Sequence, residues 1–319
     1  MAAPSGAPSR ARSSSEPQGC VVIASYGDAA VIVSPPLEGS LVERARSLAA
    51  LASSLRDQLP SADIVQGGSS LLVLGATTEA ILAAVAVPVS PEQAAASHHD
   101  ISVIYDGPDL AAVAERARIT PEDVVRLHGE RTYTALVTGF LPGFAYLGEV
   151  DPRIAAPRLA TPRKRVAPGA VGIAGSLTGV YPFASPGGWN LIASAIEPRL
   201  FDQSRDPPRR IGVLDTVRFV PAERAAVASS SDVAEAAHET GAPALEIGRS
   251  APIATVQDRG RFGFRGRGLP WSGALDRETL DAANAAVGND TDAAAIEIPL
   301  ASFEAIARSD LVVSIDGEP

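Results

Sequence analysis

The sequence predicts a small α+β unit followed by a mainly β part that is typical of a β-barrel or sandwich. In the first unit, short apolar runs alternate with segments whose apolar residues recur at helical spacing, as in 41–59. After Arg131 the chain changes to short apolar runs separated by Gly and Pro, the pattern of packed β-sheets. From Pro243 a second β-like unit begins, with one predicted helix at 277–287 that a Gly-Asn pair ends.

Local patterns predict the elements of the first unit. Residues 1–19 are rich in Ser, Pro, Ala and Arg and lack an apolar core, which indicates a disordered tail and no secretory signal, a transit peptide being the alternative. The expected elements are strands at 20–24 and 30–33 around a Gly-Asp turn, a helix at 41–59, a strand at 70–74, a helix at 78–87, and the closing residues Pro88 and Pro91.

The second unit is expected to open with a strand at 101–105 and a short helix at 110–118. Thr120 and Pro121, followed by two acidic residues, have the order expected at the start of another helix, which ends at His128. The expected organisation is a tail at 1–19, an α+β domain at 20–98, a β-barrel domain at 99–222, a linker at 223–242 and a last domain at 243–319.

Composition excludes several classes of protein. The 319 residues carry 27 basic and 37 acidic side chains, and this net charge of −10 argues against a nucleic-acid partner, which requires a basic face. One cysteine excludes a disulfide framework, and the four histidines form no zinc motif, so any metal ligands stay unknown. No run of about 18 apolar residues predicts a membrane span. By exclusion, we expect a cytoplasmic globular protein.

The segment Thr138–Gly148 concentrates aromatic residues in a chain that is only 5% aromatic. Phe140, Phe144 and Tyr146 lie on a loop that a Pro-Gly pair tightens. The rings form either a wall for a planar ligand or a plug at the end of a barrel, and the residues alone do not decide between these alternatives.

The segment Arg158–Gly175 combines basic side chains with glycines. Glycines let backbone amides approach an anion, and guanidinium groups add bidentate contacts. In an acidic protein this cluster would attract an anionic substrate; the alternative is a solvated basic loop. The P-loop pattern is absent, so nucleotide binding cannot rest on that motif. The residues concerned are Arg158, Arg163, Lys164, Arg165, Gly169, Gly172 and Gly175.

Two further segments combine turn glycines with polar groups. In Tyr181–Asn190 a Pro-Gly-Gly turn lies between Ser185 and Trp189, and the absence of a GxSxG pattern disfavours a serine hydrolase. In Thr255–Asp276 charged residues precede a glycine-rich stretch, which is either a site for a carboxylate or phosphate or a charged hairpin. Its candidate residues are Gln257, Asp258, Arg259 and Arg261.

His128 has two interpretations. At the C-terminal end of a helix its imidazolium is favoured by the helix dipole, which is a structural role. An imidazole near neutral pH also serves as a general acid or base.

Together these motifs resemble a known family. Residues 20–221 resemble the B-type subunit of bacterial 5-oxoprolinase, the family of a sporulation-kinase inhibitor, and residues 244–318 resemble the opening of the C-type subunit. The same pair is similar to the carboxyltransferase part of urea carboxylase, often labelled allophanate hydrolase subunits 1 and 2. The matching runs are 140–144, 160–163, 171–175 and 185–189 for the B-type subunit, and 255–261, 270–276 and 287–289 for the C-type subunit.

The resemblance implies a cyclophilin-like β-barrel behind the small α+β domain, and a partial second cyclophilin-like barrel. It also implies an ATP-dependent hydrolase that opens the lactam of 5-oxoproline to glutamate together with a separate A-type subunit, with ATP and Mg²⁺ as cofactors. Phosphorylating the lactam oxygen would create a leaving group before water attacks, and this step requires positive charge around the phosphoryl oxygens.

The resemblance further implies roles for the motif residues. The arginines would bind a phosphate or the substrate carboxylate, glycine amides would cradle the anion, and His128 would shuttle a proton. The expected catalytic residues are His128, Arg165 and Asp258, and the expected binding residues are Phe144, Arg158, Arg163, Gly172, Gly175, Ser185, Gly187, Gly188, Trp189, Gln257 and Arg261.

The chain departs from the family pattern at several positions. Leu177 stands where the family usually has Gln, residues 193–195 replace Gly-Arg-Thr, and Ala145 replaces a proline. The C-type module normally continues well beyond the length present here. We therefore expect an incomplete second barrel, with a completed C-type module and the A-type protein of 5-oxoprolinase as partners, and leave open whether this chain is active by itself.

Three functions remain open from the sequence. The first is a component of ATP-dependent 5-oxoprolinase. The second is the carboxyltransferase portion of a urea carboxylase or urea amidolyase system, which predicts biotin-carboxylase and biotin-carrier partners that this chain does not contain. The third is a non-catalytic inhibitor of a histidine kinase.

Overall fold

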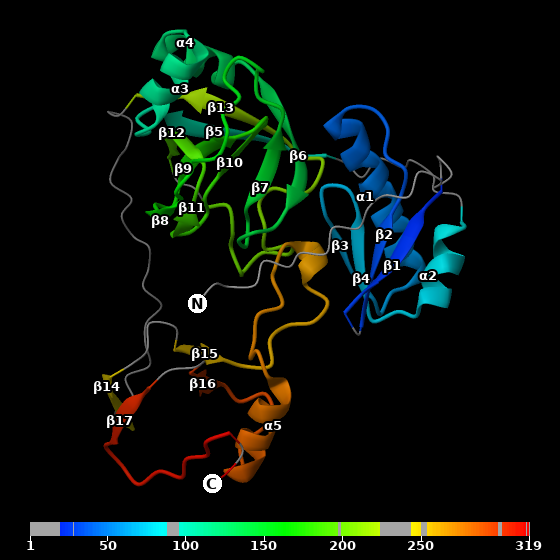
Figure 1. Ribbon diagram of the computed structural model, residues 1–319, viewed down its shortest axis with the longest axis vertical. Helices are drawn as coiled ribbons and strands as arrows, with labels where there is room; N and C mark the ends of the chain where they lie inside the picture. Colours follow the sequence, from blue (N-terminus) through cyan, green and yellow to red (C-terminus); the bar gives the residue numbers. More distant parts are fainter. Residues whose placement is uncertain are drawn as a thin grey trace, which may run out of the picture.

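Three hydrophobic clusters organise the first two thirds of the chain: one in a small α+β domain, one inside a closed β-barrel, and a smaller one around Phe144, Tyr181 and Trp189. Figure 1 shows the small domain, in blue and cyan, beside the green barrel, with the orange and red C-terminal part below. The predicted tail, nearly all of the predicted linker and the two closing prolines lie outside the described residues. The computed structural model describes residues 20–27, 29–87, 96–196, 199–223, 244–249, 254–298, 302–316 and 318.

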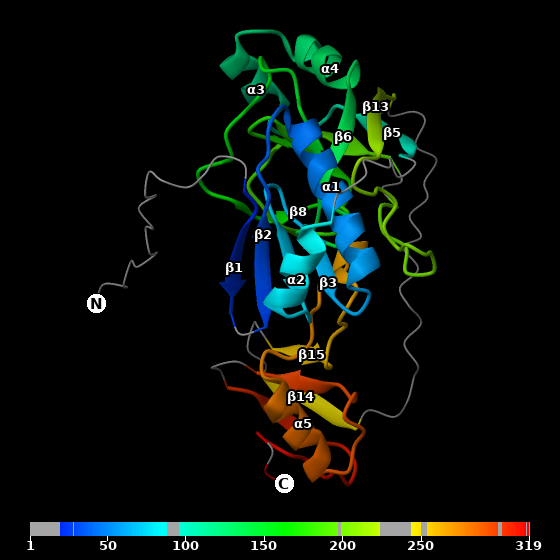
Figure 2. The same ribbon diagram turned by 90° about the vertical axis from the view of Figure 1, so that its right-hand side faces the viewer.

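The small domain is a four-stranded antiparallel sheet, in the order β1-β2-β4-β3, with two helices packed on it (Figure 2). Val33 and Val73 of the sheet are fully buried with Leu48, Leu55 and Ile81 of the helices. The first helix begins with a capping box between Ser40 and Glu43. The elements are β1 (Val22–Tyr26), β2 (Ala30–Ser34), α1 (Leu41–Gln58), β3 (Asp63–Gln66), β4 (Leu71–Leu74) and α2 (Thr78–Val85).

Seven strands close into a barrel in the order β10-β7-β6-β13-β5-β12-β9, which confirms the predicted fold class. β13 and β5 pair in parallel, whereas the other pairs are antiparallel. Large buried side chains such as Tyr133, Leu147, Ile173 and Phe219 fill the interior. The strands are β5 (His98–Ile104), β6 (Thr132–Thr138), β7 (Ala145–Gly148), β9 (Ala170–Ala174), β10 (Leu177–Val180), β12 (Asn190–Ala195) and β13 (Thr216–Pro221).

A separate two-stranded sheet and two short helices accompany the barrel. The sheet pairs β8 (Arg163–Val166) with β11 (Ser185–Gly187) in antiparallel orientation, and the helices are α3 (Leu110–Ala117) and α4 (Pro121–Gly129). As predicted, α4 starts at Pro121, and the hydroxyl of Thr120 accepts a hydrogen bond from the backbone N–H of Asp123.

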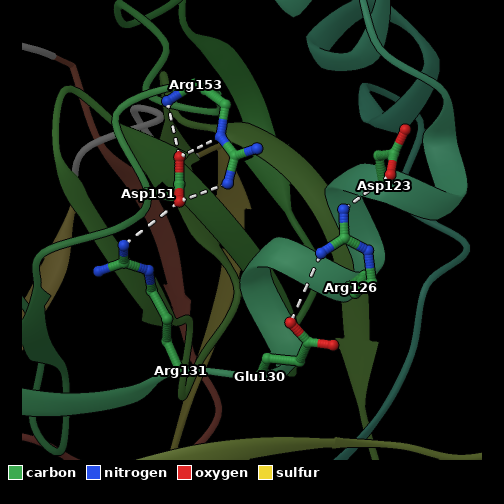
Figure 3. A network of polar contacts seen from close by, with 6 residues as sticks. All are labelled: Asp123, Arg126, Glu130, Arg131, Asp151 and Arg153. Atoms are coloured by element: carbon green, nitrogen blue, oxygen red, sulfur yellow. Dashed lines mark hydrogen bonds and ion pairs between the residues drawn. The ribbon is translucent and has the colours of Figure 1, made fainter.

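Figure 3 shows a network of polar contacts with two groups of ion pairs, one at α4 and one that joins the start of β6 to the loop after β7. Asp151 accepts hydrogen bonds from the backbone and guanidinium of Arg153 and from Arg131, 3.3 Å away. These bonds, those from Arg153 first, hold the pKa of the Asp151 carboxyl well below its usual range. On α4, Arg126 pairs with Asp123 at 2.9 Å. The network thereby fixes the loop after β7 against the start of β6.

The described residues beyond 243 form two two-stranded antiparallel sheets, β14–β17 and β15–β16, and one α-helix. This part contacts the other two through the short 3₁₀ turn η2, which packs against β3, while Arg267 pairs with Asp206 of the barrel domain. Among the described residues, no helix is long and apolar enough to cross a membrane. The elements are β14 (Leu245–Arg249), β15 (Thr255–Gln257), η2 (Arg265–Arg267), α5 (Arg277–Ala286), β16 (Ala295–Glu297) and β17 (Glu304–Ala307).

Candidate functional site

Two of the four segments selected from the sequence meet at the barrel and form an aromatic cluster, defined as Phe140, Phe144, Tyr146, Tyr181 and Trp189. The ring of Phe144 lies 4.9 Å from Tyr146 and 5.5 Å from both Tyr181 and Trp189, measured between centroids. Phe144, Tyr181 and Trp189 are buried, whereas Phe140 is 57% exposed. The cluster is therefore a packed plug with one exposed ring, Phe140, and the ligand wall stays a prediction.

A tight turn places the two phenylalanines of the cluster. Gly139 and Gly143 have φ angles of 147° and 80°, and a Cβ at Gly143 would lie 2.7 Å from the carbonyl oxygen of Leu200. The backbone N–H of Gly139 donates to the carbonyl of Phe144 at 3.1 Å, which closes the turn. Phe140 itself has a φ of 75°, a left-handed conformation that is unfavourable for a bulky side chain.

Arg158 adds positive charge beside this cluster. Burial raises the pKa of the phenols of Tyr146 and Tyr181, and the charge of Arg158 opposes this rise in both. The guanidinium also approaches Gly188, where an added Cβ would lie 3.7 Å from the Arg158 Nε. An exposed guanidinium next to aromatic rings is suited to bind the anionic group of a small planar ligand.

Arg163, also predicted to bind an anion, is already paired. Its Nη2 donates to Asp109 Oδ1 at 2.7 Å, and Asp109 Oδ2 accepts the backbone N–H of Leu191 at 2.7 Å. Asp109 was not predicted from the sequence. Its two hydrogen bonds connect β8, through Arg163, to the start of β12, through Leu191. Arg163 therefore has a structural partner and is not a free anion-binding group.

The predicted cradle of glycine amides is not formed by Gly172 and Gly175. Gly172 is paired inside β9, between Gly179 and Leu191, and the N–H of Gly175 donates to the carbonyl of Ala156 at 2.6 Å. Packing explains the small residue at 172, because an added Cβ would lie 3.0 Å from the Cβ of Trp189. Regular sheet pairing thus uses the backbone that an anion would need.

Replacing Gly187 with alanine is expected to destabilise the site, whereas the same change at Gly188 is not. A Cβ at Gly187 would lie 2.5 Å from the hydroxyl of buried Tyr181, while the nearest atom to a Cβ at Gly188 is 3.6 Å away, in Pro162. Overpacking of this kind costs about 1–3 kcal/mol. Urea denaturation of the two variants tests this, and equal free energies of unfolding would contradict it.

Arg165 lies on β8 and Ser185 on β11, the two strands of the separate sheet. Arg165 is exposed, so it can meet an anion, and its catalytic role stays a prediction. Ser185 is buried, and its Oγ has no hydrogen-bond partner among the described residues. A buried hydroxyl without a partner is unfavourable, so the unpaired Oγ marks a polar group that a ligand or a water molecule would satisfy.

His128 lies inside the barrel and is completely buried. The Thr178 hydroxyl donates to the carbonyl of Gly172 at 3.0 Å, so His128 Nε2–H donates to Thr178 Oγ1 and Nδ1 accepts from the Tyr105 hydroxyl. Burial lowers the pKa of the imidazole to about 3, so it is neutral and not the imidazolium considered for the helix end. This environment favours the structural interpretation over the proton shuttle.

The predicted site residues of the fourth segment contact other residues of the same segment and, within the described part of the chain, none of the rings of the aromatic cluster. Asp258 accepts the N–H of Gly260 at 2.7 Å, Gln257 donates to Thr255 at 3.0 Å, and the backbone of Arg261 bonds to Trp271. These are contacts within the segment, so Asp258, Gln257 and Arg261 build a turn. Their expected catalytic and binding roles stay predictions.

The described residues at the cluster do not fit a magnesium site. No group of three or more His, Cys, Asp or Glu side chains arranged for a metal ion occurs in the described part of the chain. Magnesium requires oxygen ligands, and both carboxylate oxygens of Asp109 are engaged by Arg163 and Leu191. The exposed Arg158, which lies near Tyr146 and Tyr181 of the cluster, fits an anionic group instead.

Comparisons with known proteins match two parts of the chain separately, a long N-terminal part and a short C-terminal part. The family model described as carboxyltransferase domain, subdomain C and D, matches residues 21–211, and that described as carboxyltransferase domain, subdomain A and B, matches residues 267–319. The B-type subunit of 5-oxoprolinase from Haemophilus influenzae is 36% identical over 211 residues, which are 62% of this chain and 96% of that protein.

Two further matches include the C-terminal part. The C-type subunit of 5-oxoprolinase from Escherichia coli strain K12 is 46% identical over 66 residues, 21% of each chain. The crystal structure of TTHA0988 has 32% sequence identity and a TM-score of 0.67, and the match covers 87% of this chain but 57% of that one. The chain thus spans little more than half of this solved structure and about a fifth of the C-type relative.

Proposed function

The chain belongs to the family of the carboxyltransferase domain, subdomain C and D, and from this premise we propose that it is a component of a 5-oxoprolinase. The order of two matches carries the proposal: a B-type relative over the first part of the chain and a C-type relative over a shorter, later part. In this proposal an A-type protein and the rest of a C-type module complete the enzyme. The complex opens 5-oxoproline to glutamate with ATP.

The proposed role of this chain is to bind and orient the substrate. 5-Oxoproline is a small ring with one carboxylate, and the exposed Arg158 supplies a cation near the rings of Tyr146 and Tyr181. A guanidinium forms bidentate hydrogen bonds with a carboxylate, while an aromatic face packs against the ring. Holding the lactam in one orientation aids the later chemical step without a proton-transferring group at this cluster.

ATP and magnesium are assigned to other parts of the proposed complex. Asp109 is engaged and Arg158 is the cation proposed for the substrate, so the cluster leaves no carboxylate set for a metal ion bound to phosphates. We therefore expect ATP binding to depend on the partner proteins.

Replacing Arg158 with alanine is expected to raise the KM for 5-oxoproline about 10- to 100-fold in the assembled complex. Hydrogen bonds to charged groups contribute about 1.5–3 kcal/mol, and each 1.4 kcal/mol corresponds to a tenfold change in affinity. The measurement is ATP-dependent glutamate formation by this chain mixed with an A-type protein and a complete C-type module.

Arg116→Ala is the matched control, because Arg116 is equally exposed but lies on α3. An unchanged KM in Arg158→Ala would remove the assignment of Arg158 only. Absence of activity in the wild-type mixture would reject the 5-oxoprolinase proposal. Biotin-dependent carboxylation of urea after addition of biotin-carboxylase and biotin-carrier proteins, or inhibition of a histidine kinase by this chain, would support the alternatives.

A further inference from the structure

A second site lies between the small domain and the barrel. There, α1 and strands β6, β7 and β10 surround a pocket of about 430 Å³, a volume within the range of about 300–1,000 Å³ for small-molecule sites. None of the lining side chains is charged. They are Leu41, Ala45, Gly68, Leu136, Val137, Gly139, Phe140, Tyr146 and Leu177.

The two walls of this pocket are held together by one side chain. Gln66 Nε2 donates to the carbonyl of Ala45 on α1 at 3.2 Å and to the carbonyl of Leu136 on β6 at 3.4 Å. Both acceptors belong to lining residues. The pocket is therefore already formed in this structure, and a ligand does not have to separate the two domains.

Phe140 at the rim provides an independent observation. It combines a left-handed φ of 75° with a side chain that is 57% exposed, two features that are each unfavourable for phenylalanine. Edge contacts with Phe144 and Tyr181, at centroid distances of 5.5 and 6.3 Å, hold the ring in place. Backbone strain of this kind concentrates at sites that contact ligands.

Tyr146 links the pocket to the aromatic cluster. It lines the pocket, and its ring lies 4.9 Å from Phe144 and 5.8 Å from Trp189. The pocket is otherwise apolar, so the phenol of Tyr146 is the side-chain hydrogen-bonding group among its lining residues.

We propose that this pocket binds a small uncharged molecule with an aromatic or branched apolar body and one hydrogen-bonding group that meets Tyr146. None of the lining side chains offers a charge to an anion such as 5-oxoproline, so the ligand of this pocket differs from that of the proposed site at Arg158, with which the pocket shares Tyr146. Binding changes the surroundings of Trp189 through Tyr146. The inference does not depend on the proposed 5-oxoprolinase function.

The test uses the neutral fluorescent probe N-phenyl-1-naphthylamine with the full chain. Ala45→Phe fills the pocket from α1, and Ala83→Phe is its control on an exposed position of α2. Phe140→Gly removes the rim ring while keeping a residue that adopts a positive φ, and Phe183→Gly is its control at another exposed phenylalanine. Circular dichroism verifies that each variant is folded.

Saturable binding of the probe to the wild type is expected, with at least tenfold weaker binding in Ala45→Phe and Phe140→Gly and wild-type binding in both controls. In a Trp271→Phe background, the fluorescence of Trp189 should change as the probe saturates. Binding that is non-saturable, or equal in all variants, would overturn the proposal. An affinity that falls as protein concentration rises would show that a second copy of the chain occupies the pocket, and would also overturn it.

Discussion

Replacing Asp109 with alanine is expected to lower the free energy of unfolding by about 3–5 kcal/mol. The change removes the partner of the Arg163 guanidinium, whose side chain is only 29% exposed, and leaves the N–H of Leu191 without its acceptor. Removing one member of a largely buried ion pair costs about this much, because the remaining charge stays desolvated. Urea denaturation monitored by circular dichroism measures the loss.

Two further variants separate the charge of Asp109 from its hydrogen bond. Asp109→Asn keeps an acceptor for Leu191 and should lose less stability than Asp109→Ala. The double variant Asp109→Ala with Arg163→Ala should be more stable than the sum of the single losses predicts, because neither charge then remains unpaired. Strict additivity would show that the two side chains do not interact.

The second large effect concerns His128, which is expected to make the protein sensitive to acid. An imidazole in the unfolded chain titrates near pH 6.5, whereas burial lowers the pKa of His128 in the fold to about 3. Between these values the unfolded state binds a proton that the folded state does not. The free energy of unfolding therefore falls as pH decreases through this window, by up to about 1.4 kcal/mol per pH unit, or about 2–3 kcal/mol at pH 4.5.

His128→Gln isolates this contribution. Glutamine does not titrate, and its amide supplies one donor and one acceptor for Thr178 and Tyr105. The variant should be less stable than the wild type at pH 7, and the difference should shrink as pH decreases toward 4.5. Protonation of carboxylates with a lowered pKa, such as Asp151, also lowers the free energy of unfolding in acid, but by the same amount in both proteins. A difference that is independent of pH would contradict the buried neutral imidazole.

The proposed substrate site and the proposed second pocket differ in the chemistry of their side chains. The cluster near Arg158 combines aromatic rings with exposed positive charge, while the pocket beside α1 is apolar and uncharged. Tyr146 belongs to both, so its burial and its contact with Trp189 connect the two environments.

Elements defined by neighbours in the chain were predicted well. The start of α4 follows from Thr120 and Pro121, whose cap contacts span three residues, and the end of α5 follows from Gly288, which has a φ of 74°. Strand β3 was missed because its four residues contain only two apolar side chains, and its place depends on pairing with β4. The other elements that were predicted with bounds differ from them by only a few residues, whereas the strands after Arg131 were predicted only as a pattern of short apolar runs.

The candidate site likewise has features that local sequence predicts and features that depend on long-range contacts. The aromatic and basic segments were identifiable because their composition is unusual in this chain, and their family motifs lie in contiguous runs. The hydrogen-bond partners of these residues were not identifiable from the sequence, because they lie far away along the chain. Asp109 is 54 residues from Arg163 and 82 from Leu191, and His128 is 50 residues from Thr178. No local sequence pattern predicts contacts between residues so far apart in the chain.

The sequence alone determined the fold class, the family and the segments that carry charge and aromatic rings, because these depend on composition, periodicity and contiguous motifs. Only the tertiary structure decided which of those groups are available. Closing the barrel buries His128, pairs Arg163 with Asp109 and uses the backbone of Gly172 in a sheet, while Arg158 stays exposed. The physical reason is that burial and hydrogen bonding are properties of long-range contacts, and these contacts determine whether a side chain stabilises the fold or meets a ligand.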